Sequence, residues 1–305
     1  MLRMVKTEMT KKTKKQMDYL CRLCGGTLDN FFTKKILGKY DISYYKCSHC
    51  HSLQTEKPYW LHEAYKKNTF FNTDTGAVQR NLHNLAACFT ISKLIKTKNV
   101  IDIGGGDGLL CRLLRDYKIN CYVKDKYAIP TYGLGFTEEN FNKPDLIIGF
   151  EVLEHYPNPI SDLEDLFSRQ PRALLLSTAI YNNEKQDWWY LSPESGQHVF
   201  FYSKKAMTMI AAKYEYELII SGGFILLVKN LSPLTKVVAK ILLKALVLRL
   251  LKSIIFFLAT PGVWQDHLLQ VEKSKDGNRP LEPKAVEVEF FPMEEVLHEK
   301  VKIHR

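Results

Sequence analysis

Four cysteines near the N-terminus form two Cys-x-x-Cys pairs that are separated by a longer stretch of chain. Zinc prefers four tetrahedral ligands, and a Cys-x-x-Cys turn lets two thiolates face one ion while backbone N–H groups support the sulfurs. Gly25 and Gly26 follow the first pair and supply the tight turn that such a site needs. Because thiolates take all four positions, the site would be closed and structural. The predicted zinc ligands are Cys21, Cys24, Cys47 and Cys50.

A glycine-rich turn, DIGGGDG, follows the apolar run at 99–103. Glycines where a strand leads into a helix let the backbone turn sharply and approach a ligand. Asp125 follows the next apolar run, where an acid can accept hydrogen bonds from both hydroxyls of a ribose. Several nucleotide cofactors are bound by turns of this kind. The predicted cofactor-binding residues are Asp102, Gly104, Gly106, Gly108 and Asp125.

A third apolar run, DLIIGF at 145–150, leads directly into Glu151 and the string VLEH. The spacing Asp-x-Gly-x-Gly-x-Gly at 102–108 resembles motif I of class I S-adenosylmethionine (SAM) methyltransferases, and 145–155 resembles the fourth-strand signature of the same family. The resemblance spans about residues 80–230 and implies SAM as the cofactor. It places Glu151 beside both the cofactor and the path of the methyl group, so we predict cofactor-binding and catalytic roles for this residue. It also implies a seven-stranded Rossmann-like α/β sheet, mostly parallel, with an antiparallel terminal hairpin.

Glu151, Glu154 and His155 are spaced so that they would share one face of a helix. In ubiquinone-type O-methyltransferases a similar trio has been linked to a divalent metal. Many relatives share the string without needing a metal, so we expect a structural role here and keep the metal as the alternative.

The segment 187–203, DWWYLSPESGQHVFFYS, combines paired tryptophans with one histidine. Aromatic rings can stack on the C–H faces of sugars, although such segments can also be plain core. A hydroxyl that accepts a methyl group must lose its proton, and a neutral histidine is suited to take it at pH 7. We therefore predict that His198 is the catalytic base, with a structural histidine as the alternative.

Residues 18–230 as a whole resemble methyltransferases that carry an N-terminal zinc-binding module and act on sugars, including nucleotide-sugar C-methyltransferases and enzymes of surface-polysaccharide clusters. The strings PYWLHEAY at 58–65 and DTGAVQRN at 74–81 belong to that resemblance. Sugar C-methyltransferases typically show a Glu-His pair in the loop where this chain has Gln197 before His198. The resemblance therefore implies methylation of a sugar or glycan hydroxyl, in a surface polysaccharide, a lipid-linked glycan or a nucleotide-sugar, with C-methylation as the alternative.

An alternation of strands and helices must position these residues. Hydrophobic spacing predicts a helix over 81–95 and, after it, a mainly parallel sheet covered by helices on both faces. We expect strands at 99–103, 119–124, 145–150 and 172–180, helices at 109–117, 161–169 and 203–213, and a hairpin over YELIISGGFILLV. The predicted layout is a basic tail (1–17), a zinc-binding module (18–58), a SAM methyltransferase domain (59–230), a basic amphipathic helical region (231–271) and a polar C-terminal tail (272–305).

The positive charge is concentrated in two segments. The chain of 305 residues has a formal net charge of +10. Residues 1–17 and 231–262 account for it, because the first holds six bases and one acid and the second holds five bases and no acid. Basic residues at 236, 240 and 244 recur every four positions among Leu, Val and Ile, and the charges leave no uninterrupted 18-residue apolar stretch. We expect 234–260 to lie on an anionic membrane surface; a core helix pair or a dimer contact are alternatives.

The neutral remainder of the chain argues against a nucleic-acid partner, since such proteins carry basic charge on the folded body. An RNA methyltransferase with a zinc module, or a zinc-bearing adaptor that keeps a methyltransferase-like scaffold, are the alternatives to a glycan-modifying enzyme. Seven cysteines, four of them clustered, and a polar N-terminal segment argue against a secreted disulfide framework. We expect a cytoplasmic protein, peripheral on the inner face of the membrane.

Overall fold

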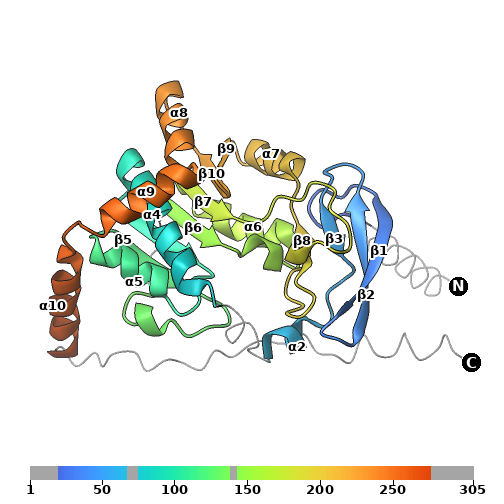
Figure 1. Cartoon of the computed structure of the whole chain (residues 1–305), viewed down its shortest axis with the longest axis horizontal. Coiled ribbons are helices and arrows are strands. Elements are labelled where there is room, and N and C mark those ends of the chain that lie inside the picture. The colour runs from blue at the N-terminus through green and yellow to red at the C-terminus, as the bar shows by residue number, and fades with distance from the viewer. Residues whose placement is uncertain (1–19, 67–74, 138–142, 276–305) are drawn as a thin grey trace, which may run out of the picture.

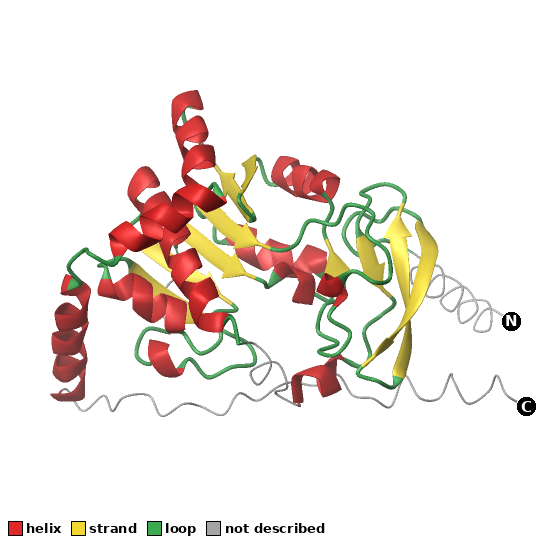
Figure 2. Cartoon of the chain, in the orientation of Figure 1, coloured by secondary structure: helices red, strands yellow, loops and turns green. Residues whose placement is uncertain are grey.

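The computed structural model describes residues 20–66, 75–137 and 143–275 (Figure 1). The tail predicted at 1–17 lies outside these ranges, and so does the tail predicted at 272–305 except for residues 272–275, which are helical. The described chain forms two sheets with helices packed around the larger one (Figure 2). This confirms the predicted α/β class.

The larger sheet has six strands in the order β5-β4-β6-β7-β10-β9. The β4–β5, β4–β6 and β6–β7 pairs are parallel, whereas β10 is antiparallel to both β7 and β9. The terminal hairpin and the strands expected from the apolar runs are therefore confirmed. The strands are β4 (Asn99–Ile103), β5 (Asn120–Lys124), β6 (Leu146–Phe150), β7 (Ala173–Ser177), β9 (Glu217–Ser221) and β10 (Phe224–Val228).

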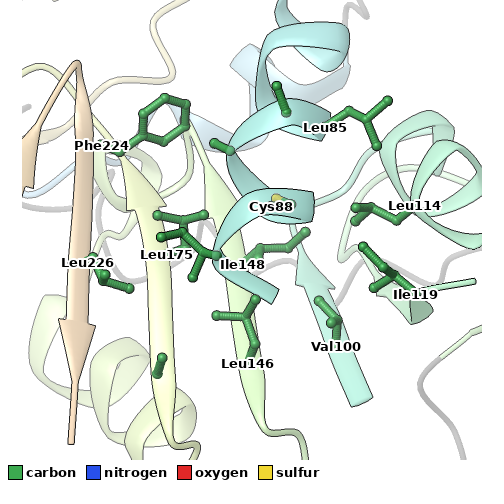
Figure 3. Packing of buried hydrophobic residues seen from close by; sticks show 14 of the residues in the cluster. Leu85, Cys88, Val100, Leu114, Ile119, Leu146, Ile148, Leu175, Phe224 and Leu226 are labelled. Carbon is green, nitrogen blue, oxygen red and sulfur yellow. The ribbon is translucent and has the colours of Figure 1, made fainter. Parts of the chain in front are cut away.

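Side chains alternate between the two faces of this sheet, as the two-residue period of a strand requires. On β6, Leu146 and Ile148 join the core beneath α4 (Figure 3). Ile147 joins a second core beneath α6 and α7. Cys88 of α4 lies over the first face and is fully buried. The helices are α4 (Ala77–Ile95), α5 (Leu109–Asp116), α6 (Pro159–Ser168) and α7 (Lys204–Lys213).

The sheet has six strands in the described chain instead of the seven predicted. Beyond β5, where a seventh strand would pair, the chain makes a single bridge between Val123 and Thr137. Pro130 and two glycines interrupt the intervening sequence, which forms the short helix η1 (Thr131–Gly133). Proline removes a ladder donor and glycine weakens a strand, so this sequence favours turns over a paired edge. Residues 138–142 lie outside the described ranges.

The smaller sheet joins the zinc module to the rest of the chain. Its strand order is β1-β2-β3-β8, and all of its pairs are antiparallel. The last strand comes from the stretch that we assigned to the methyltransferase domain, so the module's sheet is completed by a distant segment. The strands are β1 (Leu28–Ile36), β2 (Tyr40–Cys47), β3 (Leu53–Thr55) and β8 (Phe200–Phe201), and α2 (Leu61–Lys66) follows β3 along the chain.

Between residues 231 and 275 the chain forms three helices: α8 (Pro233–Leu242), α9 (Ala245–Ile255) and α10 (Pro261–Lys275). Lys244 has an extended backbone and caps α9, so the continuous basic stripe predicted at 236, 240 and 244 is broken between two helices. α10 docks on α5 through a buried bidentate ion pair in which Asp266 accepts from Arg115 at 2.8 Å on both oxygens. Within the described ranges, no helix has the length and apolar character to cross a bilayer.

Candidate active site

The predicted cofactor turn lies at the carboxyl end of β4, directly before α5. Gly108 caps α5 with a φ of +81°, and a Cβ there would lie 2.8 Å from the backbone nitrogen of Gly133. Gly106 also has a positive φ, +57°, but a Cβ there would meet no atom within 4 Å. The turn therefore packs closely against its own protein at Gly108 and faces open space at Gly106. A ligand can approach the backbone on that open side.

Asp125 holds this turn in place from the end of β5. Its Oδ2 accepts from the backbone nitrogen of Gly106 at 2.9 Å, and its Oδ1 accepts from the nitrogens of Tyr127 and Ala128. Each carboxylate oxygen has two lone pairs, so Oδ2 can still accept one further hydrogen bond, from a ribose hydroxyl. The predicted Asp125 therefore lies beside the predicted glycines.

Asp102 lies beneath the turn and is only 2% exposed. Its Oδ2 has no hydrogen-bond partner among the described residues. Burial, followed by the negative charges of Asp125 and Asp107, raises the pKa of Asp102 to about 8. An orphaned acceptor under an open glycine turn fits the positively charged methionine end of SAM, which carries an ammonium group and a sulfonium.

Glu151 directly follows β6 and lies in the left-handed region, with a φ of +55°. Its carboxylate accepts from Ser177 Oγ at 2.7 Å and from the Tyr190 hydroxyl at 2.8 Å. The backbone turn separates its side chain from those of Glu154 and His155, which lie on the short helix η3 (Leu153–His155). The three residues therefore do not share one helical face, and the structure does not bring together the metal trio that we kept as the alternative.

A different trio forms instead. Glu154, His155 and His198 place one ligand atom each within 4.8 Å of one another, and these three could hold a metal ion. Each histidine Nε2 lies 3.9 Å from Glu154 Oε1. Glu154 is 0% exposed, and neither of its carboxylate oxygens has a hydrogen-bond partner in the described chain. Its pKa is raised to about 8, mainly by burial and then by the charge of Glu151.

Both histidines are anchored through their other nitrogen. His198 Nδ1 lies 2.7 Å from the backbone oxygen of Tyr190, and because a carbonyl can only accept, Nδ1 carries the proton and Nε2 keeps a lone pair. His155 Nδ1 pairs with the Tyr65 hydroxyl at 3.0 Å. Burial is the main cause that lowers the pKa of both rings, so they are neutral at pH 7. A neutral ring is what a general base or a metal ligand requires.

The four predicted zinc ligands converge on one point. Cys21 and Cys50 have their sulfurs 3.6 Å apart, and Cys24 and Cys47 have theirs 3.5 Å apart. A tetrahedral zinc ion with Zn–S bonds of about 2.3 Å separates its sulfurs by roughly 3.8 Å, so the cluster fits this ion. All four are free thiols. A Cβ on Gly26 would lie 3.0 Å from the Cys47 sulfur, which explains the glycine there.

The zinc knuckle is connected to the trio by Arg22, which lies between Cys21 and Cys24. Its guanidinium donates to the backbone oxygens of Pro157 at 3.1 Å and Val199 at 2.7 Å. The nitrogen of Val199, in turn, donates to the backbone oxygen of Glu154 at 2.8 Å. One partly buried arginine therefore connects the zinc knuckle to the segments that flank Glu154 and His198.

Comparison with protein families gives the chemistry of the cofactor side. Residues 72–220 match the family model Methyltransf_23, described as a methyltransferase domain. This part of the chain is a methyltransferase domain. SAM is therefore its cofactor, and the chain is a SAM-dependent methyltransferase. The open turn at Gly106 with Asp102 and Asp125 beside it fits that cofactor.

Several solved structures resemble parts of the methyltransferase. The methyltransferase domain of bacterial CtHen1 is 18% identical, with a TM-score of 0.37 over 48% of this chain and 98% of that chain. Magnesium protoporphyrin IX methyltransferase from Synechocystis PCC 6803 with bound SAH is 15% identical, with a TM-score of 0.37 over 57% and 98%. The plantazolicin methyltransferase BpumL in complex with SAH is 13% identical, with a TM-score of 0.41 over 60% and 86%. No curated protein matches the chain.

The predicted residues divide into two groups in the methyltransferase. Asp102, Asp125 and Glu151 lie with the glycines at the carboxyl ends of β4, β5 and β6, whereas His198 lies with Glu154 and His155. Sequence reasoning missed Tyr65 and Tyr190, which connect the groups: the Tyr65 ring stacks on Tyr127 at 3.9 Å and its hydroxyl meets His155. The string PYWLHEAY contained Tyr65, but no spacing rule links it to residues so far along the chain.

Proposed function

We propose that this methyltransferase moves the methyl group of SAM to a hydroxyl of a sugar or glycan. The observation that carries the proposal is the position of Trp189. Its side chain is 78% exposed and meets the Tyr190 ring edge-on, with centroids 5.3 Å apart, while the Tyr190 hydroxyl donates to Glu151. An exposed aromatic face of this kind suits the C–H face of a sugar ring. Trp189 is connected through Tyr190 to Glu151, which we predict to lie beside the path of the methyl group.

The chain's own residues can manage the proton that the hydroxyl loses. SAM, when bound, supplies an electrophilic methyl group. As the new O–C bond forms, the acceptor oxygen releases a proton, and the Nε2 lone pair of His198 is the proposed acceptor. The bond from His198 Nδ1 to the Tyr190 carbonyl fixes the tautomer that this role needs. Glu151, held by Ser177 and Tyr190, is the proposed residue beside the cofactor.

The environment of Gln197 supports O-methylation over C-methylation. Its side-chain amide donates to the backbone oxygen of Ala64 at 3.1 Å, and the residue is only 8% exposed. Removing a proton from carbon needs a stronger set of bases than removing one from a hydroxyl. A buried amide that already donates a hydrogen bond to a backbone carbonyl cannot act as a second base next to His198.

The proposed acceptor lies at the inner face of the cytoplasmic membrane. A cytoplasmic setting agrees with the thiols, because none of the seven cysteines is in a disulfide. Five bases and no acid in 231–262 favour an anionic lipid surface. Lipid-linked glycans and polysaccharide ends are built at such surfaces, so they are the favoured acceptors and nucleotide-sugars are the soluble alternative.

The test uses methyl-labelled SAM with host glycolipid, nucleotide-sugar and RNA fractions supplied separately. We expect label in a glycan or nucleotide-sugar fraction. We also expect the His198→Ala variant to bind SAM normally but to lose roughly 100-fold or more in turnover, as removal of a general base does. His267→Ala, an exposed histidine on α10, is the matched control and should keep full turnover. Label in the RNA fraction alone would overturn the glycan proposal.

A further inference from the structure

The C-terminal helices expose an unusual amount of apolar surface. More than half of the exposed large hydrophobic side chains in the described chain lie between residues 234 and 269. Phe257 is 90% exposed and Trp264 is 65% exposed. Exposed apolar surface of this extent marks an interaction site. On α9 the exposed residues recur on one side of the helix, at Leu246, Leu250 and Ile254.

A groove lies between α4 and α9. The two helices lie next to each other in Figure 1. Its volume is about 420 Å³, within the range of small-molecule sites. Phe89 and Leu94 of α4 line one wall, and Leu251 and Ile255 of α9 line the other. The hydroxyl of Thr90, also in the wall, already donates to the backbone oxygen of Ala86 at 2.7 Å. The lining of the groove is therefore almost entirely apolar and can form almost no hydrogen bonds with a ligand.

Positive charge surrounds this apolar surface. Lys93 is exposed and lines the groove, with its ammonium 5.3 Å from the Phe89 ring centroid. Residues 231–262 contain five bases and no acid, and of these Lys236 pairs with Glu217 on β9. A second copy of the chain would bring the same positive charges against this face, and like charges repel. An anionic partner with a hydrocarbon part satisfies both the charge and the groove.

We propose that the groove between α4 and α9 holds a hydrocarbon chain of an anionic phospholipid, while the exposed apolar residues of α9 and α10 enter the interface of the bilayer. The inference rests on the membrane location in the proposed function and deepens it, because it assigns a lipid-binding site. Lys93 then lies beside the headgroup. α9 also packs on the main core through Leu248 and Ile255, so the bound lipid lies against the methyltransferase domain itself.

Two probes test the groove and the exposed surface separately. Vesicles of phosphatidylcholine, with and without phosphatidylglycerol, report membrane binding of the full chain by co-sedimentation. Monomeric lysophosphatidylglycerol reports the groove by calorimetry. We expect tighter binding to the phosphatidylglycerol vesicles and saturable binding of the lysolipid. Equal binding to both kinds of vesicle, or no binding of the lysolipid, would overturn the proposal.

Variants assign each effect to its residues. Thr90→Trp and Leu94→Trp fill the groove and should weaken lysolipid binding at least about tenfold. Phe257→Ser removes an exposed ring and should weaken vesicle binding by about tenfold while lysolipid binding is kept. Ile160→Ser is the matched control, an exposed isoleucine on α6, and should bind both probes as the wild type does. Unchanged lysolipid binding by both tryptophan variants would exclude the groove.

SAM binding, measured on every variant, shows that the fold is intact and keeps this test separate from the acceptor assignment. Lipid binding without label transfer to glycans would leave the groove standing and remove the glycan proposal; transfer to a soluble sugar without lipid binding would do the reverse. A change in oligomeric state caused by Phe257→Ser, with no change in vesicle binding, would show that the face is a contact between copies and overturn the lipid assignment.

Discussion

The cofactor side and the proposed acceptor side of this site are assembled in different ways. On the cofactor side, residues at the ends of adjacent parallel strands bond directly to one another, as Asp125 does to Gly106. On the acceptor side, His155 contacts Tyr65, and Glu154 is held by Val199 through segments far apart in the sequence. One side therefore needs only the central sheet, whereas the other also needs the zinc module to be in place.

The physical connection between the module and the acceptor side is specific. β8 pairs with β3 of the module's sheet directly after His198, and Ser203 at the far end of β8 donates to the backbone oxygen of Cys50. Arg22 adds its bonds to the oxygens of Pro157 and Val199. Loss of zinc should therefore disturb the acceptor side first and leave the cofactor side working.

The largest effect is expected from Cys47→Ser, which removes one of four thiolates from the zinc site. Metal binding in such small sites supplies folding free energy, so the variant should lose zinc and several kcal/mol of stability in the module. Zinc content by mass spectrometry and SAM affinity by calorimetry measure the two sides. We expect zinc and methyl transfer to be lost while SAM affinity stays within about threefold of the wild type. Loss of SAM affinity in a still-folded variant would show that the two sides depend on each other.

Gly106→Arg should produce the opposite result. The Cβ would project into the open space where we propose that SAM binds, and a positive φ strains any L side chain. We expect SAM affinity to fall at least about 100-fold, or about 2.7 kcal/mol, while zinc content is unchanged. An Arg variant that still binds SAM with near-normal affinity would place the cofactor away from this turn.

Arg22→Lys tests the connection between the zinc knuckle and the proposed acceptor side, and its effect should be smaller than those of the two changes above. Lysine keeps the charge but cannot reproduce the planar, multiple donors of a guanidinium, so it cannot bond to the oxygens of Pro157 and Val199 together. The Val199 oxygen keeps its bond from the backbone nitrogen of Thr55, so the main loss is the contact with Pro157. We expect a lower turnover number with zinc content, SAM affinity and the Michaelis constant for SAM all retained. A variant with full turnover would show that the zinc knuckle does not position the acceptor side.

The same division explains which features could be read from the sequence. The zinc ligands, the glycine turn and the strands β4, β5 and β6 were predictable because each depends on a local pattern of residue types. Glu154, His155 and His198 were not predictable as a group, since the left-handed backbone at Glu151 turns its carboxylate toward Ser177 and Tyr190. The break at Lys244 was missed because apolar and basic spacing continues unchanged from α8 into α9.

The last prediction concerns stability rather than activity, through the free energy of burying Asp102 beneath the cofactor turn. Its pKa is about 8 in the folded chain, mainly because of burial, and the ordinary value is 3.8. Between these two pH values the folded chain holds a proton that the unfolded chain has released. Stability therefore falls as pH rises from about 4 to about 8, by at most about 1.4 kcal/mol per pH unit for this one group.

Asp102→Asn removes this titratable group while nearly conserving the shape of the side chain. In the absence of SAM, the unfolding free energy of the variant should fall less steeply with pH than that of the wild type, and the two profiles should run parallel above about pH 8. Glu154 is buried in the same way and stays in both proteins, so the difference between the profiles isolates Asp102. Profiles that run parallel from pH 4 upward would mean that Asp102 is ionised under the turn, and that a positive partner must already lie beside its orphaned oxygen.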